Sequence, residues 1–259
     1  MVFNSIFFIF CFLPVFMLIY YLVPGKLRNL LLFLGSLIFY AWGEPVYVIL
    51  MLFSSIFNYY MGTELERLYY DDRKQKINLI FSIIINLAVL VFFKYYGFLL
   101  NTIGGIIGIH IPHPELSLPI GLSFYTFRNL SYLFDIYLSK VSAQRNFLTF
   151  AVYSTMFPYT SAGPIVRYTD IETQLKQRTI NIFKFGIGAE LFVKGLAKKV
   201  LLADNLSVLY SSICGHPQMS VFTSWLGILA YTMQLYFDFS GYSDMAIGCL
   251  LYTSDAADE

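Results

Sequence analysis

Long uncharged stretches dominate the first part of the amino-acid sequence. Residues 1–25 carry no charged side chain, and three more uncharged windows follow at 29–43, 45–63 and 77–93. About 20 apolar residues in a helix are enough to cross the hydrocarbon core of a bilayer. The pattern therefore predicts four membrane-spanning helices, and we expect the first one to remain attached because it lacks the basic start of a signal peptide.

The basic residues between these windows predict the orientation of the helices. Lys26 and Arg28 follow the first window, four more Lys and Arg residues lie at 64–76, and none separates the second window from the third. Lys and Arg concentrate in the cytoplasmic loops of membrane proteins. Both loops are therefore predicted to be cytoplasmic and the N-terminus to lie outside.

The pattern becomes irregular after Lys94. Residues 95–109 are rich in glycine, and short apolar stretches beyond them are interrupted by Arg128, Asp135 and Arg167. Broken segments at membrane depth are tolerated only where protein or a water-filled cavity satisfies the backbone. We expect re-entrant or short tilted helices around a polar cavity, with the Gly-x-x-x-Gly at 104–108 used for helix packing.

Residues 181–204 have the period of an amphipathic helix. One face collects Ile182, Phe185, Ala189, Phe192, Val193, Leu196 and Val200, and the other collects Lys184, Glu190, Lys194, Lys198 and Lys199. The simplest interpretation is an interfacial helix whose lysines reach the lipid headgroups, with Glu190 and Lys194 as a helical pair. The alternative is that these lysines attract an anionic donor.

Composition narrows the class of protein. The chain has 58% hydrophobic and only 13% charged residues, which rules out an ordinary soluble globular protein. A net charge of +1 gives no electrostatic reason to expect a nucleic-acid partner. The three cysteines have no metal or disulfide spacing, so no metal site is expected. The sequence predicts an all-α, polytopic transmembrane helical bundle with the lipid bilayer as its surroundings.

The candidate chemistry lies at 236–248. Asp238 and Asp244 are carboxylates in an otherwise apolar stretch, and Tyr242 and Ser243 supply hydroxyls beside them. An ionisable residue at membrane depth indicates a functional site by default. Polar residues also stabilise helix packing in membranes, so a purely structural role for the two aspartates stays open.

Three ordered motifs resemble those of the membrane-bound O-acyltransferase (MBOAT) family, alginate O-acetyltransferase type. They are residues 119–127 (PIGLSFYTF), 162–168 (AGPIVRY) and 238–248 (DFSGYSDMAIG), and the resemblance runs from Met1 to Gly248. The pair Asp244-Met245 favours O-acetyl transfer over the related D-alanyl transfer. The resemblance implies a helical bundle with a funnel from each side, in which Arg167, Asp238, Tyr242, Ser243 and Asp244 line or brace the substrate channel.

The resemblance also implies the reaction and its participants. An acetyl group would pass from a cytoplasmic thioester, acetyl-CoA or another acyl donor with no bound cofactor, to hydroxyls of an extracytoplasmic polysaccharide such as alginate. Partner acetyltransferase proteins outside the membrane would complete the transfer, and the location would be the bacterial inner or cytoplasmic membrane. Open alternatives are D-alanyl or peptidoglycan acyl transfer, and a non-enzymatic transporter or export factor.

No residue of this chain is assigned as the catalyst. The family's catalytic histidine belongs to a segment downstream of the 238–248 motif, whereas His110, His113 and His216 match no family motif and are expected in loops. Residues 249–259 (CLLYTSDAADE) resemble the translation of a sequencing adapter. We therefore predict that residues 1–248 are the N-terminal part of an MBOAT-type domain, that 249–259 are not native, and that this chain is inactive.

Overall fold

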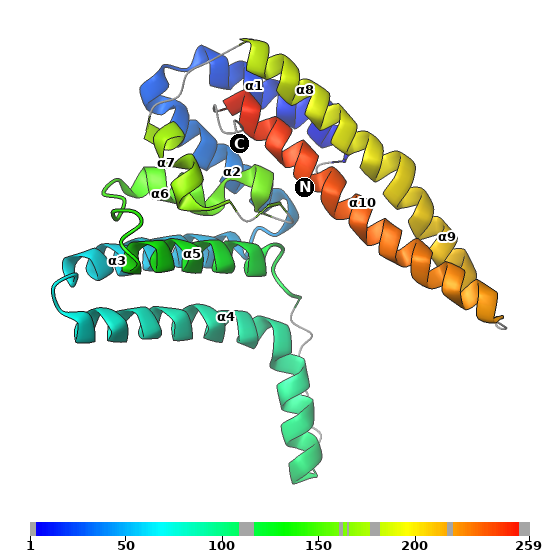
Figure 1. Cartoon of the computed structure of the whole chain (residues 1–259), viewed down its shortest axis with the longest axis horizontal. Coiled ribbons are helices and arrows are strands. Elements are labelled where there is room, and N and C mark those ends of the chain that lie inside the picture. The colour runs from blue at the N-terminus through cyan, green and yellow to red at the C-terminus, as the bar shows by residue number, and fades with distance from the viewer. Residues whose placement is uncertain are drawn as a thin grey trace. The chain divides into compact units, whose positions relative to one another are not determined.

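The computed structural model describes residues 4–108, 117–160, 163–164, 166–176, 182–216 and 220–253, and every regular element within these ranges is a helix. The chain divides into two compact units (Figure 1). The terminal unit comprises Met1–Arg28, Ala162–Pro164 and Thr173–Glu259, and the middle unit comprises Asn29–Ser161 and Ile165–Glu172. The prediction of an all-α, membrane-type fold is confirmed.

The predicted spanning windows all form helices. The π-helix η1 (Phe8–Phe12) leads into α1 (Leu13–Leu22) and, after the 3-10 turn η2 (Gly25–Leu27), α2 (Arg28–Gly43) follows. The third and fourth windows lie in α3 (Val48–Arg67) and α4 (Asp72–Ile107). Among the described residues, only α3 and α4 are both long and apolar enough to cross a bilayer.

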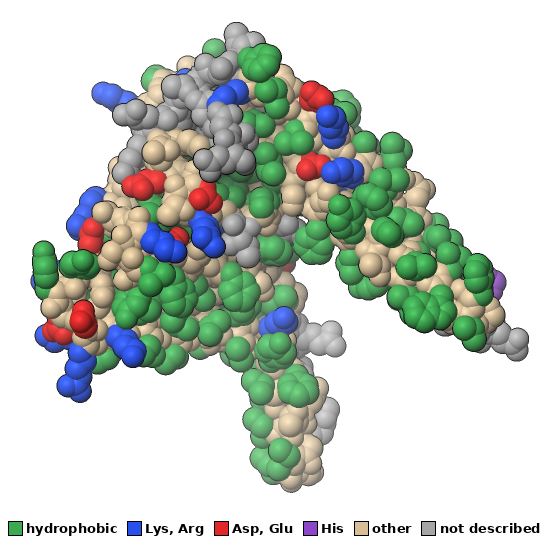
Figure 2. Space-filling view, in the orientation of Figure 1, with side chains coloured by type: hydrophobic (Ala, Val, Ile, Leu, Met, Phe, Trp, Pro, Cys, Tyr) green, Lys and Arg blue, Asp and Glu red, His purple; other side chains and the backbone are tan. Residues whose placement is uncertain are grey.

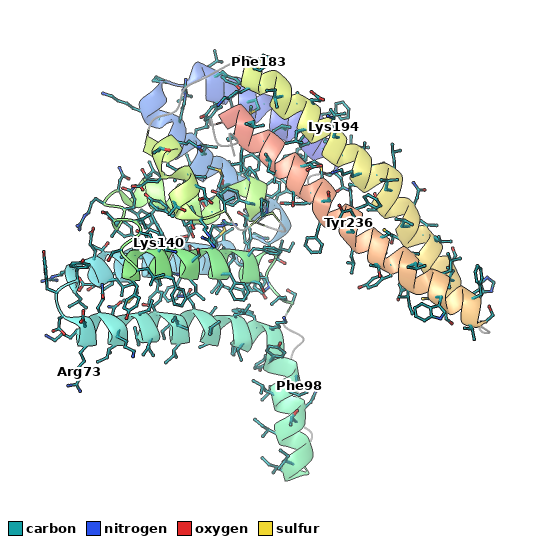
Figure 3. The ribbon with its side chains drawn as sticks, viewed as in Figure 1. Arg73, Phe98, Lys140, Phe183, Lys194 and Tyr236 are labelled. Carbon is teal, nitrogen blue, oxygen red and sulfur yellow. The ribbon has the colours of Figure 1, made fainter. Side chains whose placement is uncertain are left out.

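The irregular pattern after Lys94 does not end α4, which corrects the expectation of a broken segment at 95–109. The helix continues to Ile107 and bends in Figure 1, and Phe98, labelled in Figure 3, lies on the limb beyond the bend. Gly108 ends α4 with a left-handed φ of 75°, its N–H directed to the carbonyl of Gly104.

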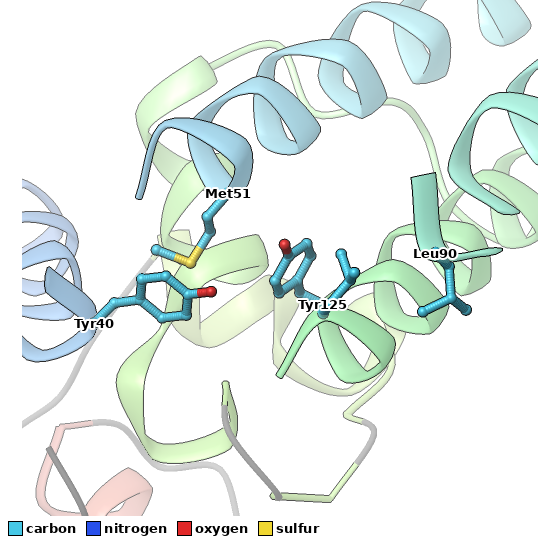
Figure 4. Packing of buried hydrophobic residues seen from close by; sticks show 5 residues of the cluster. Tyr40, Met51, Leu90 and Tyr125 are labelled. Atoms are coloured by element: carbon cyan, nitrogen blue, oxygen red, sulfur yellow. The ribbon is translucent and has the colours of Figure 1, made fainter. Parts of the chain in front are cut away.

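Short helices complete the middle unit, as predicted. They are α5 (Leu122–Tyr137), α6 (Phe147–Thr155), the 3-10 turn η3 (Phe157–Tyr159) and the start of α7 (Tyr168–Lys176). Figure 1 shows α5 beside α3 and along α4, and these three helices pack on one another. An apolar cluster joins them to α2, in which Tyr40, Met51, Leu90, Leu122 and Tyr125 are buried (Figure 4).

Polar side chains inside this unit are held by hydrogen bonds. Asn58 and Asn86 exchange reciprocal amide bonds of 3.0 and 2.9 Å between α3 and α4. The fully buried Arg128 of α5 donates to the backbone carbonyls of Ser154, at 3.0 Å, and Tyr159, and its guanidinium lies 4.1 Å above the Tyr159 ring. Arg128, which interrupts the apolar pattern in the sequence, therefore fixes the turn after α6.

Candidate functional site

The terminal unit is built on two antiparallel helical segments that run side by side in Figure 1. One consists of α8 (Ile182–Ala197), the π-helical turn η4 (Lys198–Ala203) and α9 (Asp204–Cys214), and the other is α10 (Val221–Thr253). The 238–248 motif lies in the second half of α10, opposite α8 and η4. This arrangement brings the predicted aspartates against the lysines of the amphipathic segment.

Glycines let the backbones of α8 and α10 come into contact. A Cβ atom added to Gly195 would lie 2.5 Å from the carbonyl oxygen of Gly241, and one added to Gly248 would lie 2.6 Å from that of Gly188. Real Cβ atoms do not approach carbonyl oxygens this closely, so both positions require glycine. A Cβ added to Gly241 would likewise lie 2.7 Å from the carbonyl oxygen of Gly195. Close packing thus explains Gly241 and Gly248 of the motif, as it explains small residues at helix interfaces in membranes.

The packing face of α8 differs from the predicted apolar face. Gly188, Phe192 and Gly195 are buried against α10, whereas Phe185 and Val193 of the predicted face are exposed. A stripe at positions 188, 192, 195 and 199 follows the spacing of residues that share a helix face. It leads directly to Lys199, which explains why this lysine faces α10.

Asp244 forms an ion pair with Lys198. The Lys198 Nζ lies 2.6 Å from Asp244 Oδ2 and donates a second hydrogen bond of 3.1 Å to Ser240 Oγ. The Asp244 side chain is 20% exposed, so the carboxylate is largely removed from solvent. A charged pair with an additional hydroxyl partner is the arrangement that makes a carboxylate tolerable in such surroundings.

Asp238, six residues before Asp244 on α10, is held by the neighbouring lysine. The Lys199 Nζ lies 2.8 Å from Asp238 Oδ1 and 2.9 Å from Asp204 Oδ1, so it bridges α10 and the start of α9. Consecutive residues on a helix point about 100° apart, and residues six apart point about 120° apart. Two adjacent lysines on η4 can therefore each reach one of two aspartates that lie six positions apart on α10. The two ion pairs then form one charged cluster.

A groove opens beside the Lys198–Asp244 pair. It has a volume of about 510 Å³ and is lined mainly by apolar side chains of α8 and η4, with Lys194, Lys198 and Asp244 at its polar part. Lys194, labelled in Figure 3, pairs with Glu190 at 2.6 Å, as the helical-pair prediction required. The arrangement offers an apolar surface that ends at a fixed ion pair.

The structure brings together only some of the predicted channel residues. Asp238 and Asp244 belong to the charged cluster, and Tyr242 and Ser243 are half-buried between them on α10. Arg167 belongs to the middle unit, where its side chain is exposed and its backbone N–H donates to Asp170 Oδ2 at 3.3 Å. The place of Arg167 relative to the charged cluster therefore stays a prediction.

Within the described residues, neither the histidines nor other metal-ligating side chains form a second candidate site. His216 is exposed just after α9, outside any helix as predicted, and His110 and His113 lie outside the described residues. Within the part of the chain that the structure describes, no three His, Cys, Asp or Glu side chains are grouped so that they could hold a metal ion.

Sequence reasoning missed the two lysines that hold the aspartates. The amphipathic pattern predicts that Lys198 and Lys199 reach the lipid headgroups or attract an anionic donor, whereas the structure pairs them with Asp244 and Asp238. The available signal was the energetic cost of a carboxylate in an apolar helix, which requires a cationic partner. That cost made an adjacent Lys-Lys pair in a neighbouring amphipathic helix the natural candidate.

Comparison with known proteins identifies the class. No family model matches the chain. Curated proteins align with 96% of it or more at identities from 33% to 41%, and they are named as alginate O-acetylases or as a peptidoglycan O-acetyltransferase. Together with the helical, membrane-type fold, these similarities show that the chain belongs to the MBOAT family.

Within this class the chain is similar to alginate O-acetylases and to a peptidoglycan O-acetyltransferase. It is 41% identical over 252 residues to the probable alginate O-acetylase AlgI of Pseudomonas aeruginosa, covering 48% of that protein, and 40% identical to its namesake from Azotobacter vinelandii, covering 50%. It is 33% identical over 287 aligned positions to the peptidoglycan O-acetyltransferase of Helicobacter pylori, covering 54%. The chain thus spans about half the length of these relatives.

Proposed function

We propose that this chain is the N-terminal half of a membrane-bound O-acyltransferase that acetylates hydroxyl groups of a cell-surface polysaccharide. The observation that carries the proposal is the charged cluster at the groove, because it is built from the same 238–248 motif on which the family resemblance depends. The names of the relatives support acetyl transfer, and both alginate and peptidoglycan are candidate acceptors.

The proposed reaction transfers an acetyl group from a cytoplasmic thioester such as acetyl-CoA. The acceptor hydroxyl oxygen attacks the thioester carbonyl carbon, the carbon–sulfur bond breaks, and the hydroxyl proton passes through a base to the leaving thiolate. The family resemblance assigns that base to a histidine downstream of Gly248. On this proposal the 259-residue chain shows no turnover by itself.

The charged cluster is proposed to position the reaction rather than to carry it out. Lys198 and Asp244 hold each other in place through the 2.6 Å contact between Nζ and Oδ2. A fixed ion pair at the end of an apolar groove orients bound groups without reorganising during the reaction. Tyr242 and Ser243, half-buried on the same helix, remain candidates for lining the channel.

The proposed location is the bacterial cytoplasmic membrane, with several helices crossing it and the 64–76 loop on the cytoplasmic side. The concentration of Arg and Lys in that loop supports this orientation. Extracytoplasmic acetyltransferase proteins are the proposed partners, because an acceptor polymer outside the cell requires delivery beyond the membrane.

The experiment is an acetyl-transfer assay on the full-length protein in membranes. Labelled acetyl-CoA is supplied on the cytoplasmic side, and acetyl esters on alginate and on peptidoglycan are measured separately. Label on either polymer, abolished when the downstream histidine is replaced, is the expected result. Absence of transfer to any polysaccharide, or full activity without that histidine, would overturn the proposal.

A further inference from the structure

A second groove lies in the middle unit, where the two helices that qualify as membrane spans meet. It has a volume of about 670 Å³ and is lined by Tyr69, Tyr70, Asp72, Gln75, Lys76, Tyr137 and Ser139. These residues come from the α3–α4 turn, the first turn of α4, and the end of α5. Since α3 ends and α4 begins here, the groove lies at the level of the membrane surface if both helices cross the bilayer.

The chemistry of the groove is that of a membrane interface. Figure 2 shows Lys, Arg, Asp and Glu side chains gathered at this end of the middle unit, while the rest of α4 presents mostly hydrophobic side chains. Tyr69 is half exposed and Tyr70 is 97% exposed, although both adjoin a span. Tyrosines in such positions typically contact the headgroup region of the bilayer.

One carboxylate and one ammonium group in the groove are not used in ion pairs with other described residues. Neighbouring charges are paired, Lys74 with Asp71 at 2.9 Å and Arg67 with Glu64 at 3.4 Å. Asp72 and Lys76 are one helical turn apart, about 6 Å between Cβ atoms, and both line the groove without forming a salt bridge with each other. The groove therefore offers one negative and one positive group at a fixed spacing.

The floor of the groove is rigid. Gln75 is buried, and its side-chain amide donates a 3.1 Å hydrogen bond to the carbonyl of Leu65, which ties the start of α4 to the end of α3. Because Asp72 and Lys76 flank Gln75 on the same helix, their backbone positions are fixed before any ligand arrives. Preorganisation of this kind reduces the entropic cost of binding.

We propose that this groove binds the zwitterionic headgroup of a phosphatidylethanolamine-type phospholipid. The phosphate contacts Lys76, and the primary ammonium donates charge-assisted hydrogen bonds to the Asp72 carboxylate, which the quaternary ammonium of a choline headgroup cannot do. A purely anionic headgroup could pair with Lys76 but would bring no positive group to the Asp72 carboxylate. The choice of lipid follows from the two opposite charges that line the groove. It does not depend on the acetyl-transfer function.

The test is native mass spectrometry of the whole chain in detergent micelles, titrated with phosphatidylethanolamine, phosphatidylcholine or phosphatidylglycerol of matched acyl chains. We expect phosphatidylethanolamine to bind about threefold or more tightly than either of the others, the scale of one exposed ion pair. Soluble O-phosphoethanolamine is expected to compete for the same site. Equal retention of the three lipids, tighter binding of phosphatidylglycerol, or no competition would overturn the proposal.

Two substitutions separate the charges. Lys76→Gln is expected to weaken all three phospholipids about threefold, and Asp72→Asn only phosphatidylethanolamine by a similar factor. Lys74→Gln and Asp71→Asn are the matched controls, because they remove the same charges from adjacent positions that do not line the groove. Equal effects of the groove variants and their controls would reduce the site to general surface charge and contradict the proposal.

Discussion

The two units hold polar side chains within apolar helices by different means. In the middle unit, neutral amides do so, as in the Asn58–Asn86 pair, where both residues are at most 5% exposed. In the terminal unit, ion pairs do so, and the charged groups stay partly exposed beside a groove. Neutral pairs can be buried completely at modest cost, whereas a buried charge needs several partners, as Arg128 finds in the carbonyls of Ser154 and Tyr159. The difference separates a region built for packing from one that keeps charge accessible.

Removing the close backbone contact should have the largest effect on the terminal unit. Gly195→Ala places a Cβ against the Gly241 carbonyl oxygen, so we expect a loss of about 2–3 kcal/mol in the free energy of unfolding. Thermal or denaturant unfolding in detergent measures it. Gly186→Ala is the control, because nothing lies within 4 Å of its added Cβ. Equal stability of the two variants would show that α8 and α10 do not pack through glycine.

Breaking the amide pair should have the next largest effect, and in the middle unit. Asn58→Leu leaves the Asn86 amide without its partner across α3 and α4, with an expected loss of about 1–2 kcal/mol. The double variant Asn58→Leu/Asn86→Leu should lose less than the sum of the single variants. Asn101→Leu, on the exposed part of α4, serves as the control. Strict additivity would mean that the two amides act independently.

Removing one charge in the terminal unit should lower activity much more than it lowers stability. Asp244→Asn is expected to cost only about 1 kcal/mol, because the pair is partly exposed. In the full-length protein we expect acetyl transfer to fall about tenfold or more, the scale of lost electrostatic positioning. Asp71→Asn removes the same charge from an exposed helical pair with Lys74 in the middle unit, outside this groove, and should leave transfer unchanged. Unchanged transfer in Asp244→Asn would remove the cluster from the proposed mechanism.

The smallest expected effect concerns an exposed pair in the middle unit. Hydrogen bonds from the Lys74 side chain and backbone hold the pKa of Asp71 below its ordinary value. A depressed pKa in the folded state means that the stabilisation is present at neutral pH and is lost as pH falls through that pKa. NMR titration of the Asp71 carboxyl group should give a lower midpoint pH in the unaltered protein than in a Lys74→Gln variant. Identical midpoints would show that Lys74 does not act on it.

Much of the fold could be predicted from hydropathy because long apolar windows have few alternatives to helices. The four windows, the short helices after Arg128 and the amphipathic segment all appear as helices. The continuation of α4 to Ile107 could not be predicted, since glycine-rich sequence is compatible with either a bent helix or a loop. Whether residues 249–253 are native stays a prediction, although α10 continues through them.

The candidate site could be predicted only in part. Asp238 and Asp244 stood out because charge in an apolar stretch is costly, but their partners lie 39 to 46 positions away along the chain. Pairing at that distance depends on the register of α8 and α10, which the glycines at 188, 195, 241 and 248 determine. The sequence shows those glycines but not which of them meet.

The most direct measurement is a double-mutant cycle on Lys198 and Asp244. The free energy of unfolding is measured for Lys198→Met, Asp244→Asn and the double variant in the same detergent. If the two side chains are partners across α8 and α10, the double variant should lose less than the sum of the single variants, with a coupling of about 0.5 kcal/mol or more. Additive losses would contradict the pairing on which the proposed site rests.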